Sequence, residues 1–389
     1  MGSNPTVLHR GRRARIVGLM ATSITRQQAL AWRMRRQLLD PPGRLPVGRV
    51  VGRLCGVQAQ VASSAELAVR VRRETSRAGE VGRALDEGRL VKTWAMRGAL
   101  HLLSPENGAT FLSIMAADRL WESWRRYFGT TSERMDVLWR TIRDVLDGEP
   151  LTRVELADAV TARRGLAYAE AALRSSYGEV LKPLAWKGEV CFGPSRDGRV
   201  TFTAPRAVSS RWRGLTGPDE AAPVAIESYL RAYGPATFDG LAAWLGGASD
   251  KRQLRAWFLR VGERLADVEI DGHTAYVLAA DLDELVSTRP TGAVRLVPGF
   301  DQYVLGPGTR DPLVVPAGRR AEVSRQSGWI SPVVLLDGRI CGTWKLDRQE
   351  ARIAWFSDSG RPPRRAIGAE VSRLSSILDR DLRPAIHLA

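Results

Sequence analysis

The chain has few of the residues that build disulfide or metal frameworks. Its 389 residues include only three cysteines and four histidines. The cysteines, Cys55, Cys191 and Cys341, are far apart and lack CxxC spacing, which is typical of a protein in a reducing compartment. The four histidines give no zinc-ligand pattern. We therefore expect a cytoplasmic protein without disulfides or a structural metal.

Long apolar runs are also absent. No stretch approaches the roughly 20 apolar residues that a membrane-spanning helix needs. The N-terminal segment 1–24 carries closely spaced arginines before a short, weakly apolar stretch, which matches a secretory signal poorly. We expect this segment to be a basic flexible tail, with Met20 as an alternative start of the protein.

Acidic residues and lysines are scarce relative to arginine. The 58 lysines and arginines exceed the 42 acidic residues, which gives a formal net charge of +16, and only five of the 58 are lysines. GC-rich codons would explain the preference for arginine, but not the excess of positive charge. Such an excess favours a polyanionic partner, either nucleic acid or an anionic membrane surface. Because the arginines are scattered and not gathered on one amphipathic helix, we expect nucleic acid.

Common catalytic motifs are missing as well. The sequence contains no GxxxxGKS/T loop, no GxGxxG after a predicted strand, no HExxH and no GxSxG. These absences argue against nucleotide-dependent and zinc-dependent chemistry. We expect no cofactor.

What the sequence does contain is an internal repeat of about 90 residues. Each copy reads as helices followed by a two-stranded hairpin, which is the order of a winged-helix unit. The predicted fold is mainly α with β hairpins. It comprises the tail, three tandem winged-helix units over 25–131, 132–213 and 214–291, and a small C-terminal β-rich cap with a last helix over 292–389.

The element boundaries follow from apolar periodicity, caps and turn residues. Two capping boxes, Thr25-Arg-Gln-Gln28 and Thr152-Arg-Val-Glu155, mark helix starts. The predicted helices span residues 25–39, 47–55, 60–72, 81–87, 135–146, 152–165, 168–181, 219–233, 237–245, 251–265 and 365–378. The predicted strands span residues 90–94, 99–103, 189–192, 199–204, 267–270, 274–278, 294–297, 303–305, 333–336 and 339–344.

The motif Gly56-Val-Gln-Ala-Gln60 is the most conspicuous candidate site. It places two amides at positions i and i+2 directly after a predicted helix end. Along an extended stretch such side chains point the same way. They could act together on a substrate, or each could cap neighbouring backbone groups. On spacing alone, capping by Gln58 and Gln60 is the more common explanation.

Three stretches, taken together and in this order, resemble the AlkZ and YcaQ family of winged-helix DNA glycosylases. They are Gln58-Ala-Gln60, the run LVKTWAMRGALHL over 90–102, and Pro298-Gly-Phe-Asp301. The first stretch has the Gln-x-Gln form, where other members have Asp in the second position. The resemblance implies a monomeric, nucleoid-associated, monofunctional DNA glycosylase.

The same resemblance implies the substrate and the catalytic positions. The substrate is double-stranded DNA that contains N7-alkylated purines, and the activity extends to unhooking interstrand crosslinks in self-resistance to a DNA-alkylating natural product. By carry-over from the family, Gln58 and Gln60 are the catalytic residues, with Gln60 orienting the water. No lysine lies near them in the sequence, so a Schiff-base lyase is not suggested.

The predicted hairpins supply candidate DNA contacts. Arg97 at the first hairpin tip is a candidate for a phosphate or the minor groove. His101, just after it, is either a DNA contact or a structural histidine. Arg196 and Arg199 flank the second hairpin turn, where they would contact phosphates or lie on a solvated surface. We interpret Trp94 as a core residue and not as a base wedge.

Two alternatives stay open. Asp301 either lines the active cleft or caps a turn. The whole chain could also be a non-catalytic winged-helix regulator, because a fold does not by itself confer chemistry. Three fused units with a cap argue against a simple dimeric repressor and favour a clamp around duplex DNA.

Overall fold

The computed structural model describes residues 21–117, 130–246 and 250–389, and Met20 with the rest of 1–20 lies outside them. The helices are α1 (Arg26–Arg36), α2 (Val47–Arg53), α3 (Ala62–Arg70), α4 (Glu80–Asp86), α5 (Pro105–Ala117), α7 (Ser132–Val145), α8 (Arg153–Thr161), α9 (Glu170–Arg174), α10 (Lys182–Trp186), α11 (Pro205–Val208), α12 (Pro218–Tyr233), α13 (Phe238–Leu245), α14 (Lys251–Val261), α15 (Leu282–Ser287), α16 (Gln302–Leu305), α17 (Arg320–Val323) and α18 (Arg364–Leu378).

The strands form three sheets, so the described chain is mixed α/β and has more sheet than we predicted. The sheet orders are β2-β4-β3-β6-β7-β5, β1-β8-β9 and β10-β11-β12-β13-β14. The strands are β1 (Thr22–Ser23), β2 (Val57–Gln58), β3 (Val91–Trp94), β4 (Leu100–Leu103), β5 (Leu151–Thr152), β6 (Cys191–Arg196), β7 (Arg199–Thr203), β8 (Leu265–Ile270), β9 (His273–Leu278), β10 (Val294–Val297), β11 (Val333–Leu336), β12 (Arg339–Asp347), β13 (Glu350–Trp355) and β14 (Arg383–Leu388).

Local signals placed many elements correctly. Both capping boxes are formed, so that Thr25 begins α1 and Thr152 begins α8. The three repeat hairpins are present as β3–β4, β6–β7 and β8–β9. Left-handed residues close the second and third of these hairpins at Asp197-Gly198 and Asp271-Gly272, as such two-residue turns require.

Each hairpin also pairs with a short upstream segment that precedes a helix. In the first copy β2 pairs with β4 ahead of α3, and in the second β5 pairs with β7 ahead of α8. In the third copy Ala236 pairs with Tyr276 of β9 ahead of α13. The three copies therefore share a strand-to-helix junction at an equivalent place. The glutamine motif lies at this junction in the first copy.

Four predictions were wrong. The helix predicted over 168–181 is broken into a 3-10 turn, α9 and a loop, in which Gly178 is left-handed. The strand predicted over 303–305 is α16, because the side chain of Asp301 caps its first turn. The first two hairpins are not separate wings, since β3 pairs with β6 through Lys92 and Phe192. The end of the tail is not free, because β1 pairs in parallel with β8.

Two of the elements that we did not predict, α5 and β14, have a physical explanation. Helix α5 is buried over most of its surface, so its sequence carries little amphipathic signal. Strand β14 pairs in parallel with β13, and this non-local pairing leaves no turn signal between the two strands.

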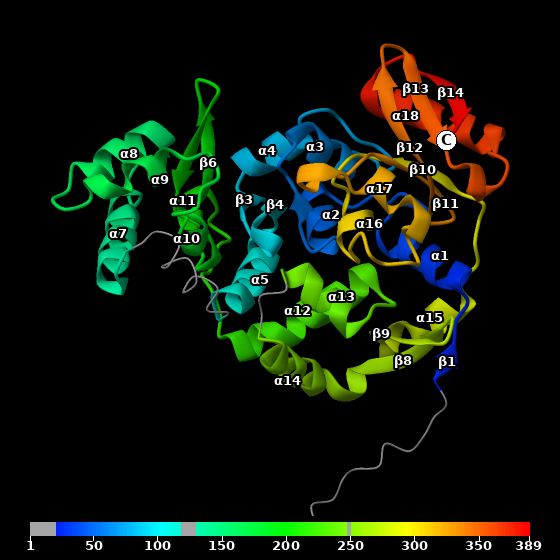
Figure 1. Ribbon diagram of the computed structural model, residues 1–389, viewed down its shortest axis with the longest axis horizontal. Helices are drawn as coiled ribbons and strands as arrows, with labels where there is room; N and C mark the ends of the chain where they lie inside the picture. The colour runs from blue at the N-terminus through cyan, green and yellow to red at the C-terminus, as the bar shows by residue number, and fades with distance from the viewer. Residues whose placement is uncertain (1–20, 118–129, 247–249) are drawn as a thin grey trace, which may run out of the picture.

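Several hydrophobic cores of the described residues cross the predicted unit boundaries. One core joins Met96 and Phe111 of the first unit to α12, α13 and α14 of the third. Another joins Leu30 and Met34 of α1 to the sheet of the C-terminal cap. In Figure 1 the second repeat, with α7, α8 and β6, stands at one end of the molecule, whereas the other repeats and the cap adjoin one another.

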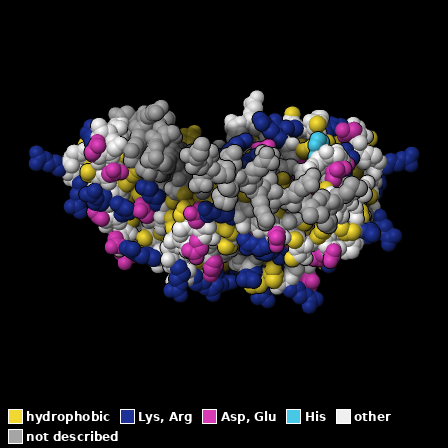
Figure 2. Space-filling view, turned by 90° about the horizontal axis from the view of Figure 1, so that it is seen from below, with side chains coloured by type: hydrophobic (Ala, Val, Ile, Leu, Met, Phe, Trp, Pro, Cys, Tyr) yellow, Lys and Arg dark blue, Asp and Glu magenta, His cyan; other side chains and the backbone are white. Residues whose placement is uncertain are grey.

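No helix in residues 21–117, 130–246 and 250–389 is long and apolar enough to cross a membrane. On the face in Figure 2, Lys and Arg side chains are spread among acidic and apolar ones.

Candidate active site

The glutamine motif forms an extended segment between two helices. Helix α2 ends at two left-handed residues, Cys55 and Gly56. A Cβ on Gly56 would lie 2.7 Å from Leu103 Cδ2, so this turn requires glycine. The ladder then continues past β2, because the amide of Ala59 donates to Leu100 O at 2.7 Å. Gln58 is thus the last residue of β2, and Gln60 lies two residues further on, in the bend that precedes α3.

The two glutamines do not cap the following helix. Helix α3 has Val61 at its N-cap, and no side chain caps it. At the equivalent junctions, Thr152 caps α8 and Thr237 caps α13 through their hydroxyls. Among the described residues, neither Gln58 nor Gln60 has a side-chain hydrogen bond to a backbone group. The structure therefore does not support the capping interpretation.

The two amides differ in exposure and partners. Gln58 is 7% exposed, whereas Gln60 is exposed. The Oε1 atom of Gln58 accepts a hydrogen bond from Arg97 Nη2 at 3.4 Å. The Gln58 amide is held at its oxygen by Arg97, and the Gln60 amide is accessible to solvent. Together they could hold a small polar molecule such as water.

Arg97 is not free at the hairpin tip, contrary to our prediction. It is left-handed, with φ of 59°, in the 3-10 turn Met96–Gly98 between β3 and β4. Its Nη1 donates to Trp244 O at 3.3 Å and to Leu305 O at 3.4 Å. Burial lowers the pKa of the Arg97 guanidinium below its ordinary value. These contacts turn the half-buried side chain toward α13 and α16, and the phosphate or minor-groove contact stays a prediction.

His101 lies opposite Gln58 in the ladder and is completely buried. Burial, and then the charge of Arg97, lower the pKa of His101 to about 3, so the ring is neutral near pH 7. Its Nδ1 bonds to Ala99 O at 2.9 Å, and its Nε2 has no partner among the described residues. No part of the His101 ring reaches the surface. The structure therefore favours a structural histidine over the DNA contact, the two alternatives for this residue.

Asp301 is also completely buried and does not line an open cleft. Its two oxygens accept hydrogen bonds from Arg72 at 2.7 and 2.6 Å. One of them also accepts from the amide of Tyr303 at 2.8 Å and so caps α16. The turn-capping alternative is the one that the structure favours. Trp94 is a core residue as predicted, 6% exposed and packed against Phe192 and Phe202.

The second hairpin presents its arginines to solvent. Arg196 and Arg199 lie in the exposed outer half of β6 and β7. Arg196 forms an ion pair with Glu155, in which both side chains are 47% exposed. The positions are thus compatible with the predicted phosphate contacts.

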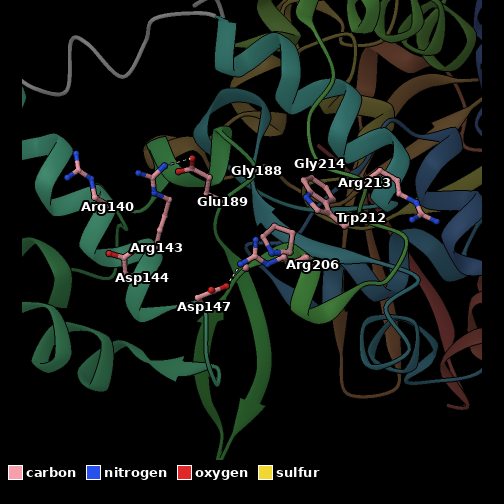
Figure 3. A pocket seen from close by; sticks show the side chains of 12 residues that line it. Arg140, Arg143, Asp144, Asp147, Gly188, Glu189, Arg206, Trp212, Arg213 and Gly214 are labelled. Carbon is pink, nitrogen blue, oxygen red and sulfur yellow. Dashed lines mark hydrogen bonds and ion pairs between the residues drawn. The ribbon is translucent and has the colours of Figure 1, made fainter.

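A basic groove that we did not predict lies near this hairpin (Figure 3). It has a volume of about 580 Å³ and lies between α7 and the segment 204–214. Arg143 pairs with Glu189, and Arg206 with Asp147. Arg140 and Arg213 line the groove without an ion pair to any residue that the structure describes. Two arginines at i and i+3 on α7 were the available sequence signal.

The fold is that of a DNA glycosylase, an enzyme that hydrolyses N-glycosyl bonds. The chain belongs to the family described as DNA glycosylase AlkZ-like, whose model matches residues 51–377.

Two comparisons give individual relatives. The chain is 44% identical over 358 residues to the interstrand DNA cross-link repair glycosylase of Streptomyces sahachiroi, covering 90% of this chain and 96% of that protein. Its structure is similar to that of Streptomyces sahachiroi DNA glycosylase AlkZ, with a TM-score of 0.90 and 42% identity over 95% of this chain and 100% of the other.

Proposed function

We propose that this glycosylase hydrolyses the N-glycosidic bond of N7-alkylated purines in duplex DNA, with Gln58 and Gln60 as its catalytic residues. The observation that carries the proposal is the junction ahead of α3. The second and third repeats place a capping threonine there, whereas the first places two amides that cap nothing. Because Gln58 and Gln60 have no capping role, their amides are available for catalysis.

The reaction needs little acid–base help. Alkylation at N7 gives the purine a formal positive charge, and the C1′–N9 electron pair cancels that charge when it moves to N9. A water oxygen then bonds to C1′ and releases one proton to solvent. The protein has to hold this water and stabilise the oxocarbenium-like transition state, and the exposed Gln60 is suited to hold the water.

Glutamine restricts the enzyme to activated substrates. An amide does not titrate near neutral pH, so it forgoes the roughly 10²- to 10⁴-fold that a general base supplies. Cationic lesions tolerate this loss because their leaving group is already activated. Normal purines, with a neutral ring and a poor leaving group, should remain uncut.

The geometry also favours a monofunctional enzyme. Lys92 is the lysine closest to the motif in the ladder, and it lies opposite Leu102, which in turn lies opposite Val57. Residues opposite one another share a face of the sheet, and successive residues alternate. Lys92 is therefore on the other face from Gln58, where it cannot attack the same sugar.

DNA binding is assigned to the repeats. We propose that the units 25–131, 132–213 and 214–291 are winged-helix units of a monomeric clamp, on the basis of their shared order of helices, junction strand and hairpin. Arg196 and Arg199 would contact phosphates, with the groove of Figure 3 beside them.

Crosslinks are the proposed natural lesions, formed by a DNA-alkylating natural product against which the enzyme protects. The similar protein of Streptomyces sahachiroi carries crosslink repair in its name. A cleft of about 1050 Å³ has apolar residues and Arg97 in its lining; neither glutamine lines it, and Arg97 links it to Gln58. This open space could receive a bulky adduct that a closed base pocket would reject.

The test is single-turnover excision from a duplex with one N7-methylguanine, read as alkali-sensitive strand breaks. Wild-type protein should produce breaks, whereas a regulator would leave the DNA intact. Gln58→Ala and Gln60→Ala should each lower the rate tenfold or more, about 1.4 kcal/mol of barrier. Gln60→Asp should retain activity, because a carboxylate also holds water.

Thr152→Ala is the matched control at the equivalent junction. It should cost about 1 kcal/mol of stability through the lost cap, with an unchanged excision rate. Wild-type rates in both glutamine variants would remove Gln58 and Gln60 from the active site.

A further inference from the structure

Arg97 is held in place before any substrate binds. Its backbone is left-handed, a conformation that is unfavourable for a non-glycine residue. Its side chain bridges two elements far apart in the sequence, through Trp244 O of α13 and Leu305 O of α16. Both anchors are backbone carbonyls, so the guanidinium position depends on the fold.

Arg97 also lacks the partner that a buried arginine usually has. Arg72, which is completely buried, forms a two-pronged ion pair with Asp301, whereas Arg97 is half-buried. No ion pair of Arg97 with any described residue is found, and its one side-chain partner is Gln58. A half-buried cation whose partners are an amide and two carbonyls is costly to keep, which points to a use at this position.

The contact fixes which end of the amide faces the guanidinium. A guanidinium has five donors and no acceptor, so the facing atom of Gln58 must be its oxygen. The Nε2 atom therefore points to another side. Within the described residues Nε2 makes no hydrogen bond.

We propose that Arg97 is a positioning residue, which holds Oε1 of Gln58 so that Nε2 is presented as a hydrogen-bond donor to the alkylated purine. This inference rests on the proposed function. As the C1′–N9 bond breaks, its electron pair moves onto the purine and makes the ring acceptors more basic. A donor at that place binds the departing base more strongly than the intact nucleotide, which is what catalysis requires. Gln60 then holds the water alone.

A double-mutant cycle tests the positioning role. Arg97→Met should lower single-turnover excision of N7-methylguanine about tenfold, as expected for coupled neighbours. The affinity for undamaged duplex should stay within about twofold, because the Arg97 guanidinium is already bonded to Trp244 O, Leu305 O and Gln58. In a Gln58→Ala background the same change should have little further effect. Arg97→Lys, which keeps a donor, should rescue part of the rate.

Gln58→Glu tests the orientation, and it does not depend on how well the Arg97 variants fold. A carboxylate keeps the acceptor for Arg97 but removes the donor. Excision should fall to the level of Gln58→Ala, while the thermal midpoint should not fall below that of the wild type. A Gln58→Glu enzyme as fast as the wild type would overturn the inference.

The remaining outcomes separate the two proposals. If Gln58→Ala is slow but Arg97→Met slows both backgrounds equally, the positioning role is wrong and the proposed function stands. If Arg97→Met instead weakens binding to undamaged and damaged DNA alike, Arg97 is a phosphate contact. If Gln58→Ala is as fast as the wild type, the proposed function itself fails.

Discussion

Two hairpins of one sheet, β3–β4 and β6–β7, have similar sequence patterns and opposite environments. The first is buried along most of its length, and its tip turns Arg97 inward against α13. The second is buried at its base but exposed over its outer half, which in Figure 1 projects upward from the second repeat.

The difference between the hairpins shows how one repeated unit can serve two roles. Strand β2, beside the first hairpin, carries Gln58. Because this hairpin is buried, the residues around Gln58 are held in place by packing. The tip of the second hairpin is exposed, so Arg196, which pairs with Glu155 at the surface, and Arg199 remain accessible to a partner. The buried hairpin holds the candidate catalytic residue Gln58 in place, and the exposed hairpin offers arginines for binding.

The largest expected effect concerns packing against the first hairpin. Gly178 is left-handed, and a Cβ there would lie 2.4 Å from the Trp94 ring. Gly198, at the second hairpin tip, is also left-handed, but a Cβ there would meet nothing within 4 Å. Gly178→Ala should cost roughly 2–5 kcal/mol by adding overpacking to backbone strain. Gly198→Ala should cost only roughly 1–2 kcal/mol.

Urea unfolding of both variants gives the two free energies. Equal losses would mean that the loop containing Gly178 moves away from Trp94 easily. The first hairpin would then be less tightly packed, relative to the second, than its contacts indicate.

The second effect is a pH dependence that comes from the first hairpin. The pKa of His101 is about 3 in the folded protein, below the ordinary value near 6.5. Protonation therefore favours the unfolded chain, and stability from the neutral ring is complete above about pH 6.5 and declines as the pH falls toward 3. One proton changes stability by about 1.4 kcal/mol per pH unit, or about 2 kcal/mol between pH 6.5 and 5.

His101→Asn removes this titration while keeping a donor for Ala99 O. Thermal or urea unfolding between pH 5 and 7.5 should show a shallower slope for the variant than for the wild type. Parallel curves would indicate that His101 charges without unfolding, and that the hairpin interior admits water.

Local chemistry explains what the sequence could predict. Capping boxes at Thr25 and Thr152, helical periodicity and tight turns act over a few residues, so they were visible in order along the chain. The glutamine motif was visible for the same reason. Its extended backbone follows from the helix end at Gly56, whose position only glycine tolerates.

Long-range packing decided the rest. The orientation of Arg97 depends on carbonyls of Trp244 and Leu305, which lie more than 140 residues away in the sequence. The burial of Asp301 depends on Arg72 in the same way. Neither sequence periodicity nor a local motif reports contacts between residues so far apart in the chain. The sequence therefore predicted the hairpin residues but not which of the two hairpins would be buried.

The smallest expected effect concerns the second hairpin. If Arg196 and Arg199 each contact a phosphate, replacing one with glutamine should reduce the slope of log affinity against log salt by about 0.9. Binding should weaken alike for damaged and undamaged duplex, since phosphate contacts carry no lesion information. The excision rate of bound DNA should not change, because these side chains lie apart from Gln58 and Gln60.

Arg383→Gln is the control, because Arg383 is an exposed arginine on β14 at the opposite end of the molecule in Figure 1. It should leave the salt slope at the wild-type value. Fluorescence anisotropy over a salt series measures all three variants. An unchanged slope in both hairpin variants would mean that the exposed hairpin does not contact the duplex, and the groove containing Arg140 and Arg213 would then be the next surface to neutralise. A fall in excision rate without loss of affinity would place the second hairpin at the catalytic site and remove the contrast between the two hairpins.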